Sequence, residues 1–416
     1  MESRGRGVVG YDRAQREEFL ALFRLRLTPR VGDLAGARLH DKFGSAQAAL
    51  AASAKDFAEV AGWTAARHRH DPAVDVRIQE VLSWARTAGV TVVGRGLPGY
   101  PPRVAQLADP PPILFLLGKM GLLDEPVVTV VGTRRATGAG RRFAGELGRV
   151  VSGAGVPVAS GLALGIDAAA HRGALEGPGS TIAVLGSALN RAHPPSHRGL
   201  QARIVREGGL LVSEFLPGEE VRPHHFPRRN RILAALPLAV AVVEAGVPSG
   251  AMITADMAGE MGRRVYTVPG SVDYPQSRGT NDLLKDGGVP LTRPGDLIPD
   301  LRAEGLVPQG HPAGEAEVGT GLADTRGLGE IPDPHGLLEV LESRPQTPDA
   351  LSRKVGLAVP RLLAALSELE LLGGAVRFPE GWRLPEREVD RRVAAVTAER
   401  RRRRRKRKSG TRRSSG

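Results

Sequence analysis

The sequence predicts an α/β protein whose central domain is an extended, Rossmann-like, doubly wound parallel sheet. Between residues 127 and 300, short apolar runs rich in β-branched residues alternate with stretches of helical spacing. Continuous apolar runs suit strands buried on both faces, and the stretches between them supply the crossover helices that parallel strands require. The predicted strands are 127–131, 156–159, 181–185, 210–212, 238–243 and 265–268. Ligands of such sheets bind beyond the carboxyl ends of the strands.

A small all-α module is expected before the sheet. Residues 11–95 are rich in Ala and Leu, and their apolar positions recur at helical spacing. Residues 27–32, followed by Phe43-Gly44, resemble half of a helix-hairpin-helix, in which a glycine-containing turn brings backbone amides to a DNA phosphate. The module would then be of the helix-hairpin-helix or SAM-like type, but a plain helical packing domain explains the same pattern and is favoured. Residues 96–126 are rich in proline and predict a connector.

A winged helix is expected after the sheet. Residues 301–333 hold seven glycines and three prolines without hydrophobic periodicity, which predicts a flexible linker. Residues 334–386 then give two helices, a longer leucine-rich helix and a hairpin, the order of a winged helix. The recognition helix would carry Arg361 against Glu368 and Glu370. Major-groove readers need cations and amides there, so a protein-contact or spacer role is favoured over sequence recognition.

The composition excludes several classes of protein. The chain of 416 residues has no cysteine, which rules out a disulfide framework, thiolate metal ligands and a cysteine nucleophile. No apolar run approaches the roughly 20 residues that cross a bilayer. The N-terminus carries no apolar segment of the signal-peptide type. We therefore expect a cytoplasmic protein that has no membrane partner.

The positive charge belongs to one end of the chain. The net charge is +13, and residues 400–416 alone contribute +11, which leaves +2 for the rest. The tail, residues 387–416, is expected to be disordered at its end because like charges repel. It could hold phosphate without sequence preference, or it could serve solubility alone. A specific function has to come from the nearly neutral body.

The first glycine-rich motif follows the first predicted strand. Residues 132–140 read Gly-Thr-Arg-Arg-Ala-Thr-Gly-Ala-Gly. The glycines let backbone amides approach an anion, the next helix directs its positive end toward it, and Arg134 can add a bidentate phosphate contact. The motif is neither a Walker A loop nor Gly-x-Gly-x-x-Gly. A strand-to-helix turn with surface arginines is the alternative.

The second motif invites a catalytic interpretation. Residues 160–167 read Ser-Gly-Leu-Ala-Leu-Gly-Ile-Asp, and His171 follows, so Asp167 and His171 share one face of the next helix. An acid–base pair would fit, but an Asp in a first helical turn usually supports the helix end, and that role is favoured. Ser160 lacks a Gly-x-Ser-x-Gly elbow and an evident base, so nucleophilic catalysis is not expected.

The richest cluster is His-His-Phe-Pro-Arg-Arg-Asn-Arg at residues 224–231. Guanidinium groups beside flat rings are typical of sites that bind single-stranded nucleic acid. An exposed basic helix start is the alternative, although arginines there oppose the helix dipole. Farther along, Ser249-Gly250 opens another helix, with Ser249 as its N-cap and amides that can hold a phosphate. The ten histidines show no metal-ligand spacing, so no metal and no other cofactor is expected.

These motifs, in this order, resemble the DNA-processing protein A family (DprA, also called Smf). The matching motifs are Gly-x-Arg-x-x-Thr-x-x-Gly from Gly132, Ser-Gly-x-Ala-x-Gly-x-Asp from Ser160, Phe-Pro-x-Arg-Asn-Arg from Phe226, Val-Glu-Ala with Ser-Gly-x-x-x-Thr-Ala from Val243, and Pro-Gly with Gly-x-Asn from Pro269. The flanking helical module and winged helix fit the family's layout. Three positions depart: Ala188 replaces a glycine, His193 a tyrosine and Val289 an alanine. These affect fine geometry and leave the class unchanged.

The resemblance implies that the chain binds single-stranded DNA, self-associates as a homodimer and loads the recombinase RecA in natural transformation, without catalysis of its own. It places Arg134, Ser160, Gly161, Phe226, Arg229, Asn230 and Arg231 in the strand-binding pocket. The full set of predicted DNA-binding residues is Gly132, Arg134, Thr137, Gly138, Ser160, Gly161, Phe226, Arg229, Asn230, Arg231, Ser249, Gly250 and Thr254. Arginines and amides would hold phosphates, while Phe226, joined by His225, would contact bases.

Two alternatives stay open. A nucleotide phosphoribohydrolase of the "lysine decarboxylase-like" type has a similar sheet and carries Pro-Gly-Gly-x-Gly-Thr-x-x-Glu. Here eight residues separate Pro269-Gly270 from Gly279-Thr280, and no Glu follows at the needed offset. The other alternative is a structural adaptor whose winged helix and tail make the contacts while the sheet is inert.

Overall fold

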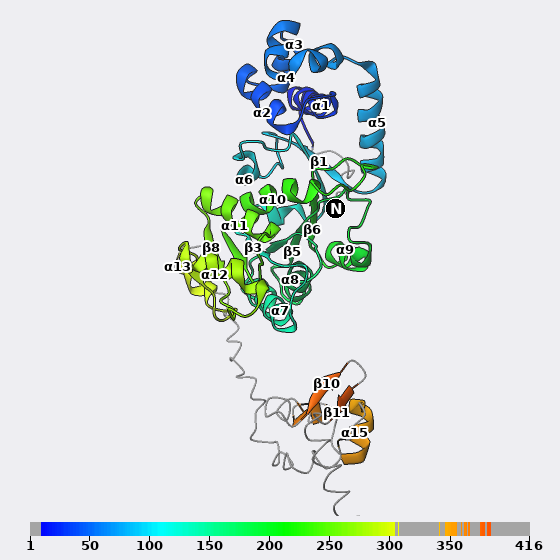
Figure 1. Ribbon diagram of the computed structural model, residues 1–416. Coiled ribbons are helices and arrows are strands. Elements are labelled where there is room, and N and C mark those ends of the chain that lie inside the picture. Colours follow the sequence, from blue (N-terminus) through cyan, green and yellow to red (C-terminus); the bar gives the residue numbers. More distant parts are fainter. Residues whose placement is uncertain are drawn as a thin grey trace, which may run out of the picture. The chain divides into compact units, whose positions relative to one another are not determined.

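The computed structural model describes residues 10–303, 307, 341, 346–355, 359, 362–363, 365–366, 375–378 and 381–383. The chain divides into two compact units, residues 1–317 and 318–416. The first unit holds the N-terminal helices and the central sheet (Figure 1). Most of the predicted linker at 301–333 and the whole tail at 387–416 lie outside the described residues.

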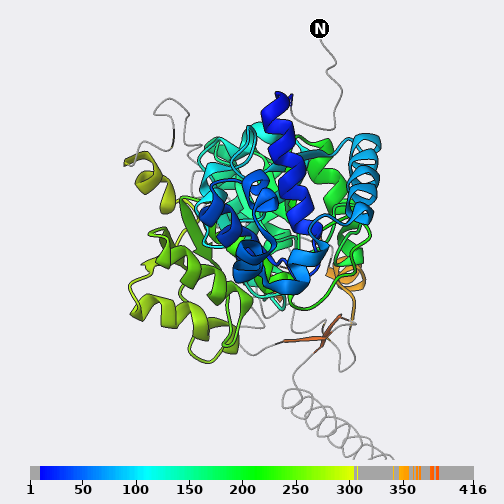
Figure 2. The same ribbon diagram turned by 90° about the horizontal axis from the view of Figure 1, so that it is seen from above.

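The N-terminal helices gather at one end of the sheet (Figures 1 and 2). They are α1 (Arg13–Leu27), α2 (Asp33–Phe43), α3 (Ala46–Ala51), α4 (Ala54–His68) and α5 (Pro72–Thr87). Asp12 starts α1 with a capping box and Asp71 caps α5, which fixes where these helices begin. Their apolar faces form a core that continues onto the sheet, where the rings of Phe23 and Phe115 have centroids 6.3 Å apart. The predicted all-α module is therefore present.

The strands of the first unit form a single sheet. They are β1 (Thr91–Gly94), β2 (Ile113–Gly118), β3 (Val128–Val131), β4 (Val158–Ser160), β5 (Thr181–Val184), β6 (Leu210–Ser213), β7 (Ala239–Val242), β8 (Arg264–Thr267) and β9 (Val289–Pro290), in the order β1-β2-β6-β5-β4-β3-β7-β8-β9. The pairs from β6 to β9 are parallel, which confirms the predicted doubly wound sheet. The chain leaves β3 toward β4 and later returns to β7 on its other side, so the topological switch point lies between β3 and β7.

The sheet is wider than the sequence predicted. β1 falls in the segment expected to be helical, β2 falls in the expected connector at 96–126, and both pair in antiparallel fashion, β2 also against β6. The connector also contains α6 (Pro102–Ala105) and a 3-10 turn, Met120–Leu123. The prolines near β2 suggested a connector, although the strand itself is apolar and buried. The two-residue β9 is too short to leave a sequence pattern.

Helices cover both faces of the sheet, as a parallel sheet requires. They are α7 (Gly138–Gly153), α8 (Ile166–Ala174), α9 (Arg198–Arg206), α10 (His225–Ala235), α11 (Gly250–Glu260), α12 (Arg278–Lys285) and α13 (Leu297–Ala303), with 3-10 turns at Pro195–His197 and Pro275–Ser277. One core packs α10 and α11 on the sheet, and another packs α7, α8 and α13 on it. α7 and α8 meet at backbone distance, because a Cβ at Gly173 would lie 1.8 Å from the Gly145 carbonyl oxygen.

The second unit agrees with the predicted winged helix where it is described. It contains α15 (Pro348–Val355) and the antiparallel hairpin of β10 (Val376–Phe378) and β11 (Gly381–Arg383). Trp382 is buried, and its backbone pairs with Gln346. Arg361, Glu368 and Glu370 of the expected recognition helix lie outside the described residues.

Candidate nucleic-acid interface

A cavity of about 730 Å³ lies at the switch point, beyond the carboxyl ends of β3 and β7. Its walls come from the β3–α7 turn, the loop before α8, the first half of α10 and the first turn of α11. The predicted site residues that line it are Gly132, Arg134, Phe226, Arg229, Asn230, Ser249, Gly250 and Thr254. A parallel sheet brings such loops to one edge, which is why residues far apart in the sequence converge there.

The ring of Phe226 contacts the side chains of Arg134 and His193. The guanidinium carbon of Arg134 lies 4.9 Å from the centroid of the Phe226 ring, and the His193 ring centroid lies 5.1 Å from it. Gly186 backs the ring, since a Cβ there would come within 2.7 Å of Phe226 Cδ1. Burial, Arg134 and Arg191 lower the pKa of His193, so its ring is neutral at neutral pH. Ring and cation form a flat, positively charged platform suited to an unpaired base.

Arg229 is a buried cation in the cavity wall. Its guanidinium donates to the carbonyl oxygens of Gly161, at 2.7 Å, and Val184, and its Nε donates to Asn230 Oδ1 at 3.2 Å. Gly161 is required there, because a Cβ would lie 2.3 Å from the guanidinium. Burial lowers the pKa of Arg229 to about 10, so the group stays charged at neutral pH. Among the described residues its nearest opposing charge is the buried Asp167, which acts from beyond ion-pair distance and raises the pKa of Arg229 against the effect of burial.

The first turn of α11 forms the opposite wall. Ser249 caps the helix, as predicted, by accepting the Ala251 N–H at 3.2 Å. Asn230 Nδ2 and Thr254 Oγ1 both donate to the Gly250 carbonyl oxygen, at 3.1 and 3.2 Å. Asn230 therefore ties the start of α11 to α10, Thr254 bonds within α11, and residues 249–251 of that start line the cavity.

Buried side chains hold the loop between β4 and α8. Asp167 accepts the Gly161 N–H at 3.1 Å, and His171 Nε2 accepts the Leu162 N–H at 3.3 Å. Leu162 has a φ of 56°, the left-handed region that disfavours a side chain, so these bonds stabilise a strained backbone. Ser160 Oγ donates to a β3 carbonyl at 2.6 Å and is fully buried. Asp167 and His171 thus hold the loop before α8, whereas the sequence favoured support of the helix end by Asp167, and Ser160 does not line the cavity.

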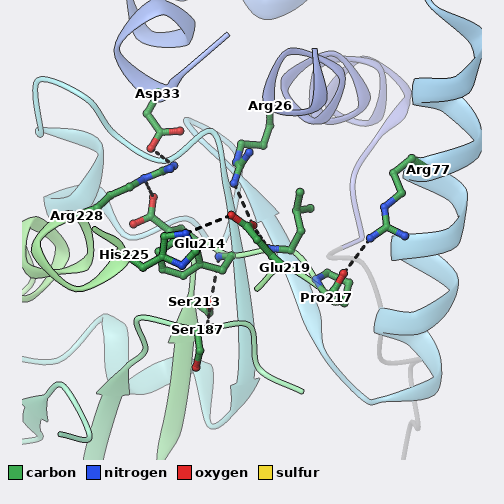
Figure 3. Close-up of polar contacts among 12 residues, drawn as sticks. Arg26, Asp33, Arg77, Ser187, Ser213, Glu214, Pro217, Glu219, His225 and Arg228 are labelled. Carbon is green, nitrogen blue, oxygen red and sulfur yellow. Dashed lines mark hydrogen bonds and ion pairs between the residues drawn. The ribbon is translucent and has the colours of Figure 1, made fainter. Parts of the chain in front are cut away.

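Arg231 does not face the cavity, so its predicted phosphate contact is wrong. Its guanidinium lies 2.6 Å from Glu214 Oε2 and 2.7 Å from Asp33 Oδ2. Figure 3 shows Arg228 bridging the same two carboxylates. We call Asp33, Glu214, Arg228 and Arg231 the docking cluster, because Asp33 starts α2 of the N-terminal module. The reason is helical geometry: residues three apart share a face, so Arg228 and Arg231 point away from Phe226 and Arg229.

His225 lies on the same side of α10 as Arg228 and Arg231, so its predicted contact with a base is also wrong. Its ring is buried, stacks on Phe215 with centroids 4.2 Å apart, and lies 3.7 Å from Glu219. Glu219 also pairs with Arg26 of α1, so Figure 3 shows a second link between the N-terminal helices and α10. His225 is therefore not available for a base.

Thr137 and Gly138 open α7 instead of lining the cavity. Thr137 caps that helix by accepting the Gly140 N–H at 2.9 Å, and its own N–H and hydroxyl donate to the Glu244 carboxylate. The amides expected to hold a DNA phosphate at this turn thus face a carboxylate of the same chain.

Sequence reasoning missed the acids that order these groups: Asp33, Glu214, Glu219 and Glu244. Glu244 left a signal, an acid at a strand end facing a glycine-rich turn. Asp33 left none, because it is separated from Arg228 by 195 positions. In the described ranges every helix is too short or too polar to span a bilayer. The same residues include no group of three acidic or histidine side chains placed to hold a metal ion.

Comparisons with known proteins identify the family of the chain. The family model described as DNA recombination-mediator protein A matches residues 91–302, from β1 to α13. The DprA winged helix domain matches residues 327–381. The chain belongs to the DNA recombination-mediator protein A family. A role in DNA processing follows from that membership.

Similar proteins cover most of the chain. Protein Smf of Escherichia coli (strain K12) is 35% identical over 306 residues, 73% of this chain and 80% of that protein. The putative DNA processing protein DprA of Mycobacterium tuberculosis (strain H37Rv) is 35% identical over 305 residues, 70% of this chain and 73% of that protein. The X-ray structure of DprA from Streptococcus pneumoniae superposes with a TM-score of 0.60 at 29% identity, covering 68% of this chain and 97% of that chain.

Proposed function

We propose that this chain binds single-stranded DNA in the cavity at the switch point and acts as a recombination mediator without catalysis. The observation that carries the proposal is the Arg134–Phe226 platform beside the buried guanidinium of Arg229. Charge neutralisation supplies affinity without sequence preference, and stacking on Phe226 selects an unpaired base.

The contacts of the polar groups support the absence of catalysis. Asp167 is occupied by main-chain amides, Ser160 by a carbonyl oxygen, and His171 by the Leu162 amide. Burial lowers the pKa of His171 to about 3, so it is neutral and already serves as an acceptor. Ser160 and His171 do not line the cavity, and Asp167, which does, accepts the amides of Gly161 and Ala163 with its Oδ2. Release of free base from nucleoside monophosphates would contradict this part of the proposal.

The test is fluorescence anisotropy of the full chain with labelled single- and double-stranded oligonucleotides over a salt series. We expect preference for the single strand, and Arg134→Ala should weaken binding about tenfold or more, as for a lost hydrogen bond to a charged group. The slope of log K against log salt should fall by about 0.7, the value for one phosphate contact on a single strand.

Two controls make the test specific. Arg142→Ala removes an equal charge from the exposed side of α7 and should change affinity little. A chain ending at Glu386 lacks the whole tail, residues 387–416, and should keep the single-strand preference. Equal affinities of wild type and Arg134→Ala in that shortened chain would remove the assignment.

We also propose, from the family resemblance, that the chain self-associates as a homodimer in the cytoplasm and loads RecA on DNA taken up in natural transformation. Sedimentation of the full chain tests the first part. The second is tested by RecA filament formation on DNA coated with single-strand-binding protein, which the chain should accelerate and the Arg134→Ala variant should accelerate less. A monomer without effect on RecA would contradict both.

A further inference from the structure

The first helix after the switch point normally receives phosphate in folds of this kind. In dinucleotide-binding Rossmann domains the pyrophosphate lies at the N-terminus of the helix that follows the first strand, and a glycine lets it approach. The equivalent helix here is α7, which follows β3. The loop before α7 lines the cavity with residues 132–135, yet neither Thr137 nor Gly140 lines it.

The carboxylate of Glu244, at the end of β7, occupies that position. Its Oε2 accepts the Thr137 N–H at 2.9 Å, and its Oε1 accepts the Thr137 hydroxyl at 2.5 Å. The Glu244 main-chain carbonyl accepts the Thr133 N–H at 2.6 Å, so both ends of the residue clamp the turn. A carboxylate at a helix N-terminus stabilises the helix dipole as a phosphate would.

Gly140 shows how closely the carboxylate sits. A Cβ on Gly140 would lie 2.3 Å from Glu244 Cδ and 2.4 and 2.6 Å from its two oxygens. A glycine is therefore needed here for the approach of an anion, and the anion is the chain's own side chain. The same closeness leaves no room for a phosphate while Glu244 is in place.

We propose that Glu244 is a specificity-determining residue that excludes the phosphates of free nucleotides and dinucleotides from the α7 turn. The chain supplies the anion of that turn itself, so an external phosphate is directed to the neighbouring cavity wall with Arg134, Arg229 and the α11 start. The first statement stands on the Glu244 contacts alone, and only the second rests on the proposed DNA-binding function.

The test uses inorganic phosphate as the probe and thermal unfolding of the full chain as the readout, against chloride at matched ionic strength. In chloride, Glu244→Ala should unfold at a lower temperature than wild type, because Thr137 loses its acceptor. Phosphate should then raise the Tm of Glu244→Ala by roughly 3 °C or more beyond any rise in wild type, as expected for a site filled well above its Kd. Glu260→Ala, which removes an exposed acid from α11, should respond like wild type.

The double variant Arg134→Ala/Glu244→Ala separates this inference from the proposed function. The extra rise should persist in it, because Arg134 points toward Phe226 and not toward the α7 turn. Loss of the extra rise would mean that phosphate binds in the cavity, and no extra rise in Glu244→Ala would equally overturn the inference. If Glu244→Ala does not fold in chloride, its recovery on refolding decides: phosphate should restore soluble protein, and equal recovery in both salts refutes the proposal.

Discussion

The guanidinium of Arg134 covers the ring of Phe226, 4.9 Å from its centroid, on the wall of the switch-point cavity. Each group is a candidate DNA contact, and each also sets the position of the other. A base that stacks at this point meets the pair and not a lone ring, because arginine and phenylalanine are both flat. The two residues are therefore expected to act as one platform.

The first prediction is that changes at these two residues are coupled. Phe226→Leu should weaken single-strand binding by about 1–3 kcal/mol, the contribution of stacking one base, while Phe226→Tyr should retain most of the affinity. In the double variant with Arg134→Ala, the total loss should be smaller than the sum of the two single losses by at least about 0.5 kcal/mol. Anisotropy titrations give the cycle. The losses of binding free energy from Phe226→Leu and Arg142→Ala should be additive, as a control. Additive losses also for Phe226→Leu and Arg134→Ala would argue against a shared platform.

The second prediction concerns the docking cluster, which ties α2 to α10. Arg231→Met should lower the free energy of unfolding by about 3–5 kcal/mol, because Asp33 and Glu214 are left buried with one fewer cation. Urea denaturation measures this loss. The salt slope of DNA binding should stay at the wild-type value, since Arg231 faces away from the cavity. A slope reduced as in Arg134→Ala would restore the phosphate role that the structure denies to Arg231.

The third prediction is a pH dependence from Glu214. Burial raises its pKa to about 7, against the opposing charges of Arg231 and Arg228, while the unfolded chain titrates this group near 4.5. The folded state thus binds the proton of Glu214 more tightly than the unfolded state does. The stability that Glu214 contributes is full below about pH 4.5 and is lost as the pH rises to 7. Denaturation of wild type and Glu214→Gln across this range should differ by up to about 1.4 kcal/mol per pH unit. A constant difference would contradict a raised pKa.

The fourth prediction is a pH dependence of stability from His171, with the opposite sign to that from Glu214. Burial lowers the pKa of His171 to about 3 from 6.5, so the folded state holds this ring neutral. Stability from this group is full above pH 6.5 and is lost as the pH falls toward 3. His171→Gln keeps an acceptor for the Leu162 N–H and removes the titration, so its unfolding free energy should fall less steeply on acidification than that of wild type. His224→Gln, at an exposed ring, is the control and should follow wild type.

The sheet could be predicted because its strands are continuous apolar runs. Strands that are buried on both faces consist almost entirely of apolar residues. The strand Ile113–Gly118 has the same character, but its proline neighbours suggested a connector. The cluster at 224–231 was recognised as a unit from its composition. Its division into a cavity face with Phe226 and a docking face with Arg231 follows from the 3.6-residue period and could have been anticipated.

Contacts between segments far apart in the chain could not be predicted from the sequence. The partner of Arg228 is Asp33, and no local pattern links an acid in the second helix to an arginine beyond the sixth strand. The same holds for the α7 turn, where the amides were assigned to an external phosphate. Only the three-dimensional placement of Glu244 shows that the anion comes from within the chain.

The fifth prediction tests that placement through Gly140. Gly140→Ala introduces a Cβ 2.3 Å from Glu244 Cδ, so overpacking should lower the free energy of unfolding by about 1–3 kcal/mol. Gly153→Ala, in the same helix but with nothing within 4 Å of the new Cβ, should be neutral or stabilising, as alanine in a helix usually is. In Gly140→Ala/Glu244→Ala the clash disappears, so urea denaturation should show a smaller loss than the two single changes add up to. Strict additivity would mean that the Glu244 carboxylate does not rest against Gly140 in solution.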